Sequence, residues 1–149
     1  MEAEILFHTE AGGEPLADGD SAQLAEWMAL VIDRRGGAAG AMNVVLCGDD
    51  YLHAMNLRYL DHDTLTDIIT FPYGDFPTVS GDLFVSTHRV ADNARELGVP
   101  YRDELHRVII HGVLHLCGLG DKNPEHAAAM RRAEDEALLL RPRPLRSPS

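Results

Sequence analysis

Two histidines four residues apart are the side chains of this chain best placed to bind a metal ion. They are His111 and His115 in the stretch HGVLHLCGLGD, where Gly118 and Gly120 precede Asp121. On a helix, positions i and i+4 share one face, so both imidazoles can point at one ion. The glycines allow the chain to fold back, which brings the Asp121 carboxylate towards the same point. Because two histidines and one later ligand form an open catalytic zinc site, we predict that these three residues bind one Zn²⁺ per chain, with water as the fourth ligand.

Other side chains suit this site less well. His126 is an alternative third ligand, but Asp121 lies closer to the end of the predicted helix. Cys117 comes two residues after His115 and so points away from the histidine pair; we expect it and Cys47 to lie in the core. The remaining histidines lack a ligand pattern and are expected at the surface or in turns: His8, His53, His62, His88 and His106.

The residue after His111 distinguishes two kinds of metalloenzyme. In the zinc-protease motif H-E-x-x-H a glutamate at this position is the general base, whereas this chain has Gly112. The motif therefore disfavours a metallopeptidase. A bound metal ion still lowers the pKa of its water to about 7 and offsets charge on phosphoryl oxygens, which suits phosphodiester cleavage. Gly112 also costs a helix about 1 kcal/mol relative to alanine, which predicts a close approach there by a neighbouring element or a ligand.

The composition is that of one ordinary globular domain. The chain has 149 residues, of which 45% are hydrophobic and 25% charged, and it has two cysteines. No apolar run approaches the ~20 residues of a membrane span, and the acidic N-terminus does not resemble a secretory signal, so we expect a cytoplasmic protein without membrane contact. The formal net charge of −11 argues against broad adhesion to nucleic acid, although a bound metal ion would add positive charge locally.

Hydrophobic periodicity predicts four strands and five helices. We expect strands over 5–9, 42–47, 68–71 and 81–85, and helices over 20–36, 49–60, 86–98, 102–117 and 123–140. Elements in this order give an α+β fold, with one layer of mixed strands packed against helices and the metal site at the end of the central helix. We expect one domain over 1–140 and a disordered Arg/Pro/Ser-rich tail over 141–149. Charged residues of the last helix are expected to face solvent: Arg131, Arg132, Glu134, Asp135 and Glu136.

Three segments together resemble the YbeY family of bacterial metal-dependent endoribonucleases. Residues 56–71, NLRYLDHDTLTDIITF, are similar to the family's N-x-x-Y-R-x-x-D-x-x-T-D-V-L-S-F. Gly81-Asp82-Leu83 is similar to G-D-I, and HGVLHLCGLGD is similar to H-G-x-L-H-L-x-G-Y-D-H. The resemblance covers roughly residues 42–140. It implies a single-strand-specific endoribonuclease of 16S rRNA 3′-end maturation and ribosome quality control. Its partners would be ribosomal RNA, the small ribosomal subunit and associated proteins, with no nucleotide cofactor.

This chain departs from the family pattern at two positions. His111 and His115 match the first two zinc ligands, but Asp121 stands where the family usually has a third histidine. A carboxylate still binds zinc, and its charge shifts the preference towards harder ions such as Mn²⁺. The family's Tyr-Arg pair is Tyr59-Leu60 here, so the basic residue associated with RNA cleavage is absent from its usual place.

The missing arginine leaves two interpretations open. Either another arginine, Arg89 or Arg107, supplies the positive charge, or the protein is a ribosome-assembly or protein-interaction factor whose metal is mainly structural. Asp82 is a candidate hydrogen-bond partner for a ligand imidazole, or else an ordinary residue at a strand edge. Thr66 and Asp67 match the family's T-D pair, and turn formation before a strand accounts for them equally well.

Overall fold

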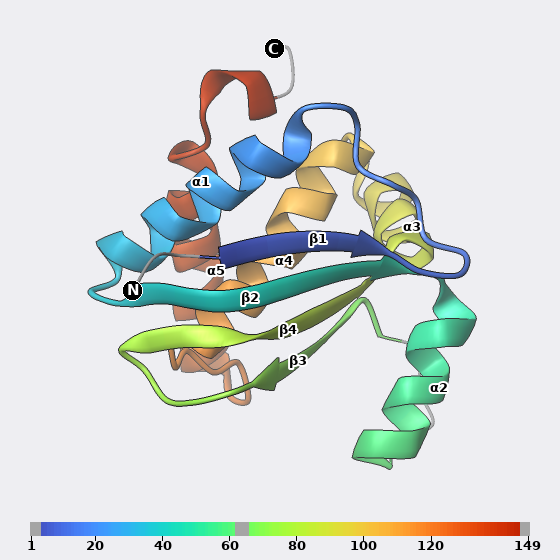
Figure 1. Ribbon diagram of the computed structural model, residues 1–149, viewed down its shortest axis with the longest axis horizontal. Helices are drawn as coiled ribbons and strands as arrows, with labels where there is room; N and C mark the ends of the chain where they lie inside the picture. Colours follow the sequence, from blue (N-terminus) through green and yellow to red (C-terminus); the bar gives the residue numbers. More distant parts are fainter. Residues whose placement is uncertain (1–3, 62–65, 147–149) are drawn as a thin grey trace.

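A mixed four-stranded sheet forms one layer of the fold (Figure 1). The computed structural model describes residues 4–61 and 66–146, so His62 and Asp63 lie outside the described residues. The strands are β1 (Glu4–Thr9), β2 (Ala38–Cys47), β3 (Ile68–Pro72) and β4 (Thr78–Ser86), in the order β1-β2-β4-β3. The β1–β2 and β2–β4 pairs are parallel and the β3–β4 pair is antiparallel. Strand β3 therefore forms one edge of the sheet.

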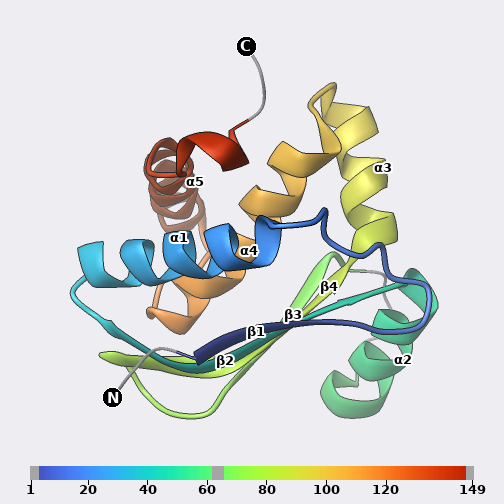
Figure 2. The same ribbon diagram turned by 45° about the horizontal axis from the view of Figure 1, so that its top comes forward.

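Five α-helices within the described residues complete the fold, which confirms the predicted α+β class. They are α1 (Asp20–Arg34), α2 (Asp49–Leu60), α3 (Thr87–Leu97), α4 (Tyr101–Leu116) and α5 (Pro124–Leu139). Four of them lie over one face of the sheet, and α2 lies at the end of the opposite face (Figure 2). None of the described helices is long and apolar enough to cross a bilayer.

Alternation along the strands gives each face of the sheet its own core. In β4, the side chains of Val79, Leu83 and Val85 are buried in the main core beneath the four helices. Phe84 points to the opposite face and packs with Leu52 of α2 in a smaller cluster. This is the period-2 pattern expected of a strand covered on both sides. Cys47 and Cys117 are both buried, as predicted.

Helix α4 crosses the sheet closely at Gly112. A Cβ atom at this position would lie 2.6 Å from Cδ1 of Ile68 and 3.0 Å from Cδ2 of Leu83, closer than van der Waals contact allows. The close approach predicted from this glycine is therefore made by strands β3 and β4. It brings the histidine-bearing turn of α4 next to the edge strand.

The described part of the C-terminal tail is ordered, which corrects the predicted disorder for residues 141–146. A short 3-10 helix, η1 (Arg143–Leu145), follows α5, and the Leu145 side chain is fully buried in the main core. The Arg141 guanidinium forms an ion pair with Asp103 of α4 at 2.8 Å. The buried Leu145 thus anchors residues 141–146 to the core. Residues 147–149 lie outside the described residues.

His106 is buried in the core, which corrects its predicted surface position. Its ring packs 5.7 Å from that of Trp27, and its Nδ1 accepts a hydrogen bond from Arg141 at 2.9 Å. Its Nε2 has no hydrogen-bond partner among the described residues. Burial, followed by the nearby charges of Arg141 and Arg102, lowers the pKa of His106 to about 4, against the raising effect of Asp103 and Asp20.

We expect this histidine to destabilise the fold in mild acid. The unfolded chain binds a proton near pH 6.5 and the native chain only near pH 4, so the native state loses stability as the pH falls through that window. The loss at pH 5 should be about 2 kcal/mol. Urea titrations of wild type and His106→Gln at pH 7.5 and 5.0 measure it. Equal acid losses in the two proteins would contradict this assignment; if His106→Gln does not fold, His106→Phe serves instead.

Candidate metal centre

The C-terminus of α4 holds the His115 imidazole in one orientation. Beyond the helix, Gly118 adopts a positive φ of 98°, and the backbone N–H of Leu119 donates to the carbonyl of Leu114 at 3.1 Å. This is a Schellman turn, which reverses the chain as the glycine predicts. The same turn brings the Leu119 carbonyl 2.9 Å from Nδ1 of His115, which donates to it. In a neutral imidazole this makes Nε2 of His115 the nitrogen with the lone pair, and it faces Nε2 of His111.

Helix α5 holds the His111 imidazole through Glu134. The His111 Nδ1 lies 2.7 Å from Oε2 of Glu134, which is 5% exposed, and Arg107 donates to Oε1 at 2.9 Å. Burial opposes ionisation of Glu134, but the hydrogen bonds from His111 and Arg107 outweigh it and lower its pKa. Burial likewise disfavours the charged form of His111, but the contact with Glu134 outweighs it and raises the pKa of His111. A carboxylate on Nδ1 is the usual outer partner of a metal-binding histidine.

His111, His115 and Asp121, the three predicted ligands, lie close together. Their nitrogen and oxygen atoms all lie within 4.8 Å of one another. The two Nε2 atoms are 2.9 Å apart, and Oδ2 of Asp121 is 3.4 Å from the first and 3.6 Å from the second. Ligands ~2.0–2.1 Å from a tetrahedral zinc ion are separated by roughly 3.3 Å. The three distances between the ligand atoms, 2.9, 3.4 and 3.6 Å, lie on either side of that value, so the site is close to the size of a zinc site.

The hydrogen bonds of the two histidines also fit a cation at this position. Both Nδ1 atoms donate, to Glu134 and to the Leu119 carbonyl. In neutral imidazoles this leaves two Nε2 lone pairs facing each other at 2.9 Å, beside a carboxylate. Such an arrangement is repulsive unless a proton or a metal ion lies between the acceptors. The donor set, two nitrogens and one oxygen, is one that binds zinc.

One expectation about the surroundings of this site was wrong: Glu134 does not face solvent but holds His111. Of the two roles considered for Asp82, the contacts agree with that of an ordinary strand residue. It accepts hydrogen bonds from Asn43 at 3.1 Å and from Tyr73. His126, the alternative ligand, is exposed at the start of α5 beside Asn123, outside the cluster.

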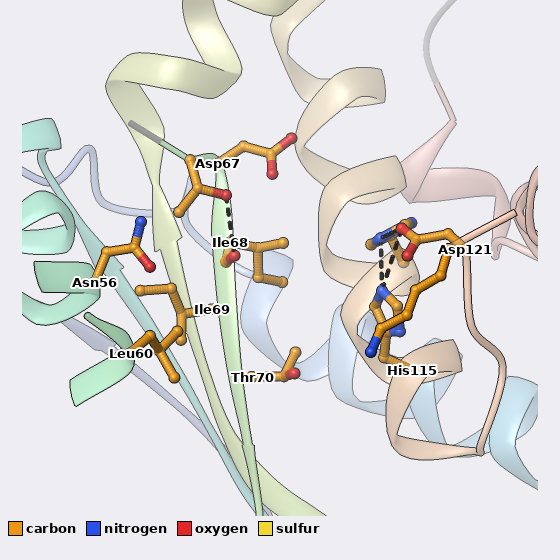
Figure 3. A pocket seen from close by; sticks show the side chains of 11 residues that line it. Asn56, Leu60, Asp67, Ile68, Ile69, Thr70, His115 and Asp121 are labelled. Atoms are coloured by element: carbon orange, nitrogen blue, oxygen red, sulfur yellow. Dashed lines mark hydrogen bonds and ion pairs between the residues drawn. The ribbon is translucent and has the colours of Figure 1, made fainter. Parts of the chain in front are cut away.

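A cavity of about 560 Å³ opens beside the three side chains. It lies along the edge strand β3, between α2 and the end of α4, and Figure 3 shows Asn56 and Leu60 on the wall opposite His115 and Asp121. Thr66 and Asp67 line it too. The Thr66 Oγ1 donates a hydrogen bond to the Ile68 carbonyl at 3.4 Å, which agrees with a turn before strand β3. The complete lining is Asn56, Leu60, Thr66, Asp67, Ile68, Ile69, Thr70, His111, His115, Asp121 and Lys122.

Neither arginine considered as a substitute for the missing one lines this cavity. Arg89 of α3 pairs with Asp49, the first residue of α2, at 3.2 Å and with Asp92 of its own helix. Arg107 pairs with Glu134 and Asp135, and it lines an adjoining, smaller cavity of about 240 Å³ that shares Asp67, Ile68 and His111 with the first. Both guanidinium groups are thus already neutralised by carboxylates.

Comparison with known proteins places this chain in a family. The family model described as "Endoribonuclease YbeY" matches residues 17–140. Among curated relatives, the Endoribonuclease YbeY of Porphyromonas gingivalis is 50% identical over 117 residues, 78% of each chain. That of Flavobacterium johnsoniae is 46% identical over 115 residues, 77% of this chain and 83% of the relative. That of Bacteroides thetaiotaomicron is 42% identical over 137 residues, 92% of this chain and 98% of the relative.

A solved structure has the same fold. It is the solution structure of TM1509 from Thermotoga maritima, with a TM-score of 0.64 and 25% sequence identity over 91% of this chain and 87% of that one. The matched region, residues 17–140, contains the three converging side chains, the cavity beside them and Glu134. This chain therefore belongs to the YbeY family of endoribonucleases.

Proposed function

We propose that this chain is a zinc-dependent, single-strand-specific endoribonuclease that acts in 16S rRNA 3′-end maturation and ribosome quality control. The observation that carries the proposal is the convergence of His111, His115 and Asp121 beside an open cavity, in a chain of an endoribonuclease family. The catalytic unit would be one metallohydrolase domain over residues 1–140. It would work in the cytoplasm, with ribosomal RNA as its substrate and the small ribosomal subunit and its associated proteins as its partners.

His111, His115 and Asp121 would hold one Zn²⁺, or Mn²⁺ given the carboxylate ligand. A divalent ion bound there supplies a water of lowered pKa and offsets charge on the phosphoryl oxygens. The protein itself contributes orientation. Glu134 and the Leu119 carbonyl fix the two imidazoles, so little reorganisation is needed when the site is loaded.

The cavity suits one segment of a single strand. Its volume of about 560 Å³ is within the usual range for a small ligand. Leu60 and Ile68 supply an apolar surface for a base, and Thr70 supplies a polar group beside it. Single-stranded RNA can present an unstacked base to such a surface, whereas a base pair in a duplex cannot.

RNA cleavage with controlled metal content tests the proposal. We expect chelator-treated wild-type protein to leave a single-stranded 16S rRNA 3′-end precursor intact, and Zn²⁺ or Mn²⁺ to restore cleavage. A duplex RNA of the same sequence and casein should both survive. If the protein binds about one metal ion per chain and the precursor nevertheless persists, the assembly-factor interpretation replaces this one. Casein cleavage would instead favour a peptidase.

A further inference from the structure

We propose that Lys122 binds a phosphate of the RNA substrate and supplies a positive side-chain charge that no arginine lining this cavity provides. The inference rests on the proposed endoribonuclease function and adds a substrate-binding residue to it. Lys122 is the only lysine of the chain, and it directly follows the candidate metal ligand Asp121. Both side chains line the same cavity.

The backbone on either side of Lys122 is held in place. Asp121 comes after the Schellman turn that ends α4, and its Oδ2 lies 3.4 Å from Nε2 of His111. Asn123 is the N-cap of α5, where its side chain accepts a hydrogen bond from the backbone of His126 at 2.8 Å. The Lys122 Cα therefore sits at a defined rim of the cavity, while the long side chain can reach a ligand inside it.

The acidic side chains that line the cavity would repel a phosphate unless a cation lies beside them. Two of its lining residues, Asp67 and Asp121, carry carboxylates, and Lys122 is the one lysine or arginine among the lining residues. The other lining residues are apolar, such as Leu60 and Ile68, or polar without a fixed charge, such as Thr70. The protein as a whole, with a formal net charge of −11, also repels a negatively charged phosphodiester. Binding its phosphate therefore depends on positive charge placed inside the cavity.

Lys122 is also available for such a role. Within the described residues it forms no ion pair, whereas Arg107 of α4 and Arg141, which follows α5, are paired with Glu134 and Asp103. An exposed ammonium with no carboxylate partner keeps its three donors for an incoming phosphate. Lysine binds phosphate as a point charge, so it needs less fixed geometry than a guanidinium. Its position next to Asp121 would place the bound phosphate beside the metal site.

Oligonucleotide binding without cleavage provides the test. A short 2′-O-methyl oligouridine is titrated into Zn²⁺-loaded and metal-free wild type, Lys122→Gln, Lys122→Arg and Arg132→Gln at several salt concentrations. Arg132 is an exposed residue of α5 outside the cavity, so Arg132→Gln makes the same charge change elsewhere. We expect Lys122→Gln to lose about 10-fold in affinity and about 0.7 in the slope of log K against log salt. Lys122→Arg should retain both, and Arg132→Gln should match wild type.

A chemical measurement tests the contact itself. Because the chain has one lysine, acetylation of its ε-amine is followed on a single peptide by mass spectrometry. Bound oligouridine should protect this amine in wild type. If wild type binds the oligonucleotide and cleaves RNA while Lys122→Gln behaves like Arg132→Gln, the role of Lys122 is refuted and the endoribonuclease function stands. If wild type neither binds nor cleaves RNA, both proposals fall.

Discussion

Replacing His115 by alanine is expected to reduce bound metal from about one ion per chain to none, and to slow single-stranded RNA cleavage more than ~100-fold. The reason is geometric. Nε2 of His115 faces both Nε2 of His111 and Oδ2 of Asp121, so its removal leaves one nitrogen and one carboxylate. Loss of an outer partner alone typically costs a metal site about 10- to 100-fold, and loss of a direct ligand should cost more. Metal analysis of the purified protein and RNA cleavage with added Zn²⁺ measure the two effects.

His126→Ala is the matched control for this prediction. His126 was the alternative third ligand, yet it is exposed on α5 and lies outside the converging group. This variant should keep wild-type metal content and activity. His115→Ala protein that is folded by circular dichroism and still holds one equivalent of metal would refute the ligand assignment. Asp121→Ala should lose metal as well, since its carboxylate completes the set.

Replacing Glu134 by glutamine should weaken metal binding about 10- to 100-fold while leaving all three proposed ligands in place. The amide can still accept a hydrogen bond from Nδ1 of His111, but it lacks the charge that makes the imidazole a stronger donor to metal. Competition for Zn²⁺ against a chromophoric chelator measures the change. RNA cleavage at saturating metal should recover much of the wild-type rate, because the cavity is unchanged.

Asp135→Asn is the control that distinguishes an effect of Glu134 on His111 from an effect through Arg107. Arg107 is shared between Glu134 at 2.9 Å and Asp135 at 2.8 Å. Asp135→Asn therefore disturbs Arg107 without touching His111, and we expect its zinc affinity to equal that of wild type. An equal loss of zinc affinity in Glu134→Gln and Asp135→Asn would mean that Glu134 acts only through Arg107. An unchanged affinity in Glu134→Gln would exclude any role in metal binding.

The sequence predicts the part of the site that lies within one helix and its following turn. Helical spacing places His111 beside His115, and the glycines predict the reversal that returns Asp121 to them. These relations depend on local backbone geometry, which sequence spacing specifies directly. The α+β class could also be predicted, because strand and helix periodicities differ and the elements do not alternate regularly.

Contacts between separate elements were harder to predict. Glu134 looks like one of several charged residues in a solvated helix, but it shares helical spacing with the buried Met130, Ala133 and Ala137. A carboxylate on an apolar stripe is the signal that could have revealed it. Likewise Asp82 is directed by strand register towards Asn43 and Tyr73, which no local pattern encodes. His106 and Leu145 are buried because α1, α4 and the tail pack together, which is a tertiary effect.

The hydrogen bond from His111 to Glu134 links the candidate ligand set to α5 as well as to α4 and its turn. An ion bound by these residues would favour only the folded arrangement, since the unfolded chain does not keep the ligands together. By mass action, free metal at about 100 times its dissociation constant adds about 2.7 kcal/mol to the stability of the native state. The supply of metal in the cell would therefore govern how long this protein persists, in addition to whether it is active.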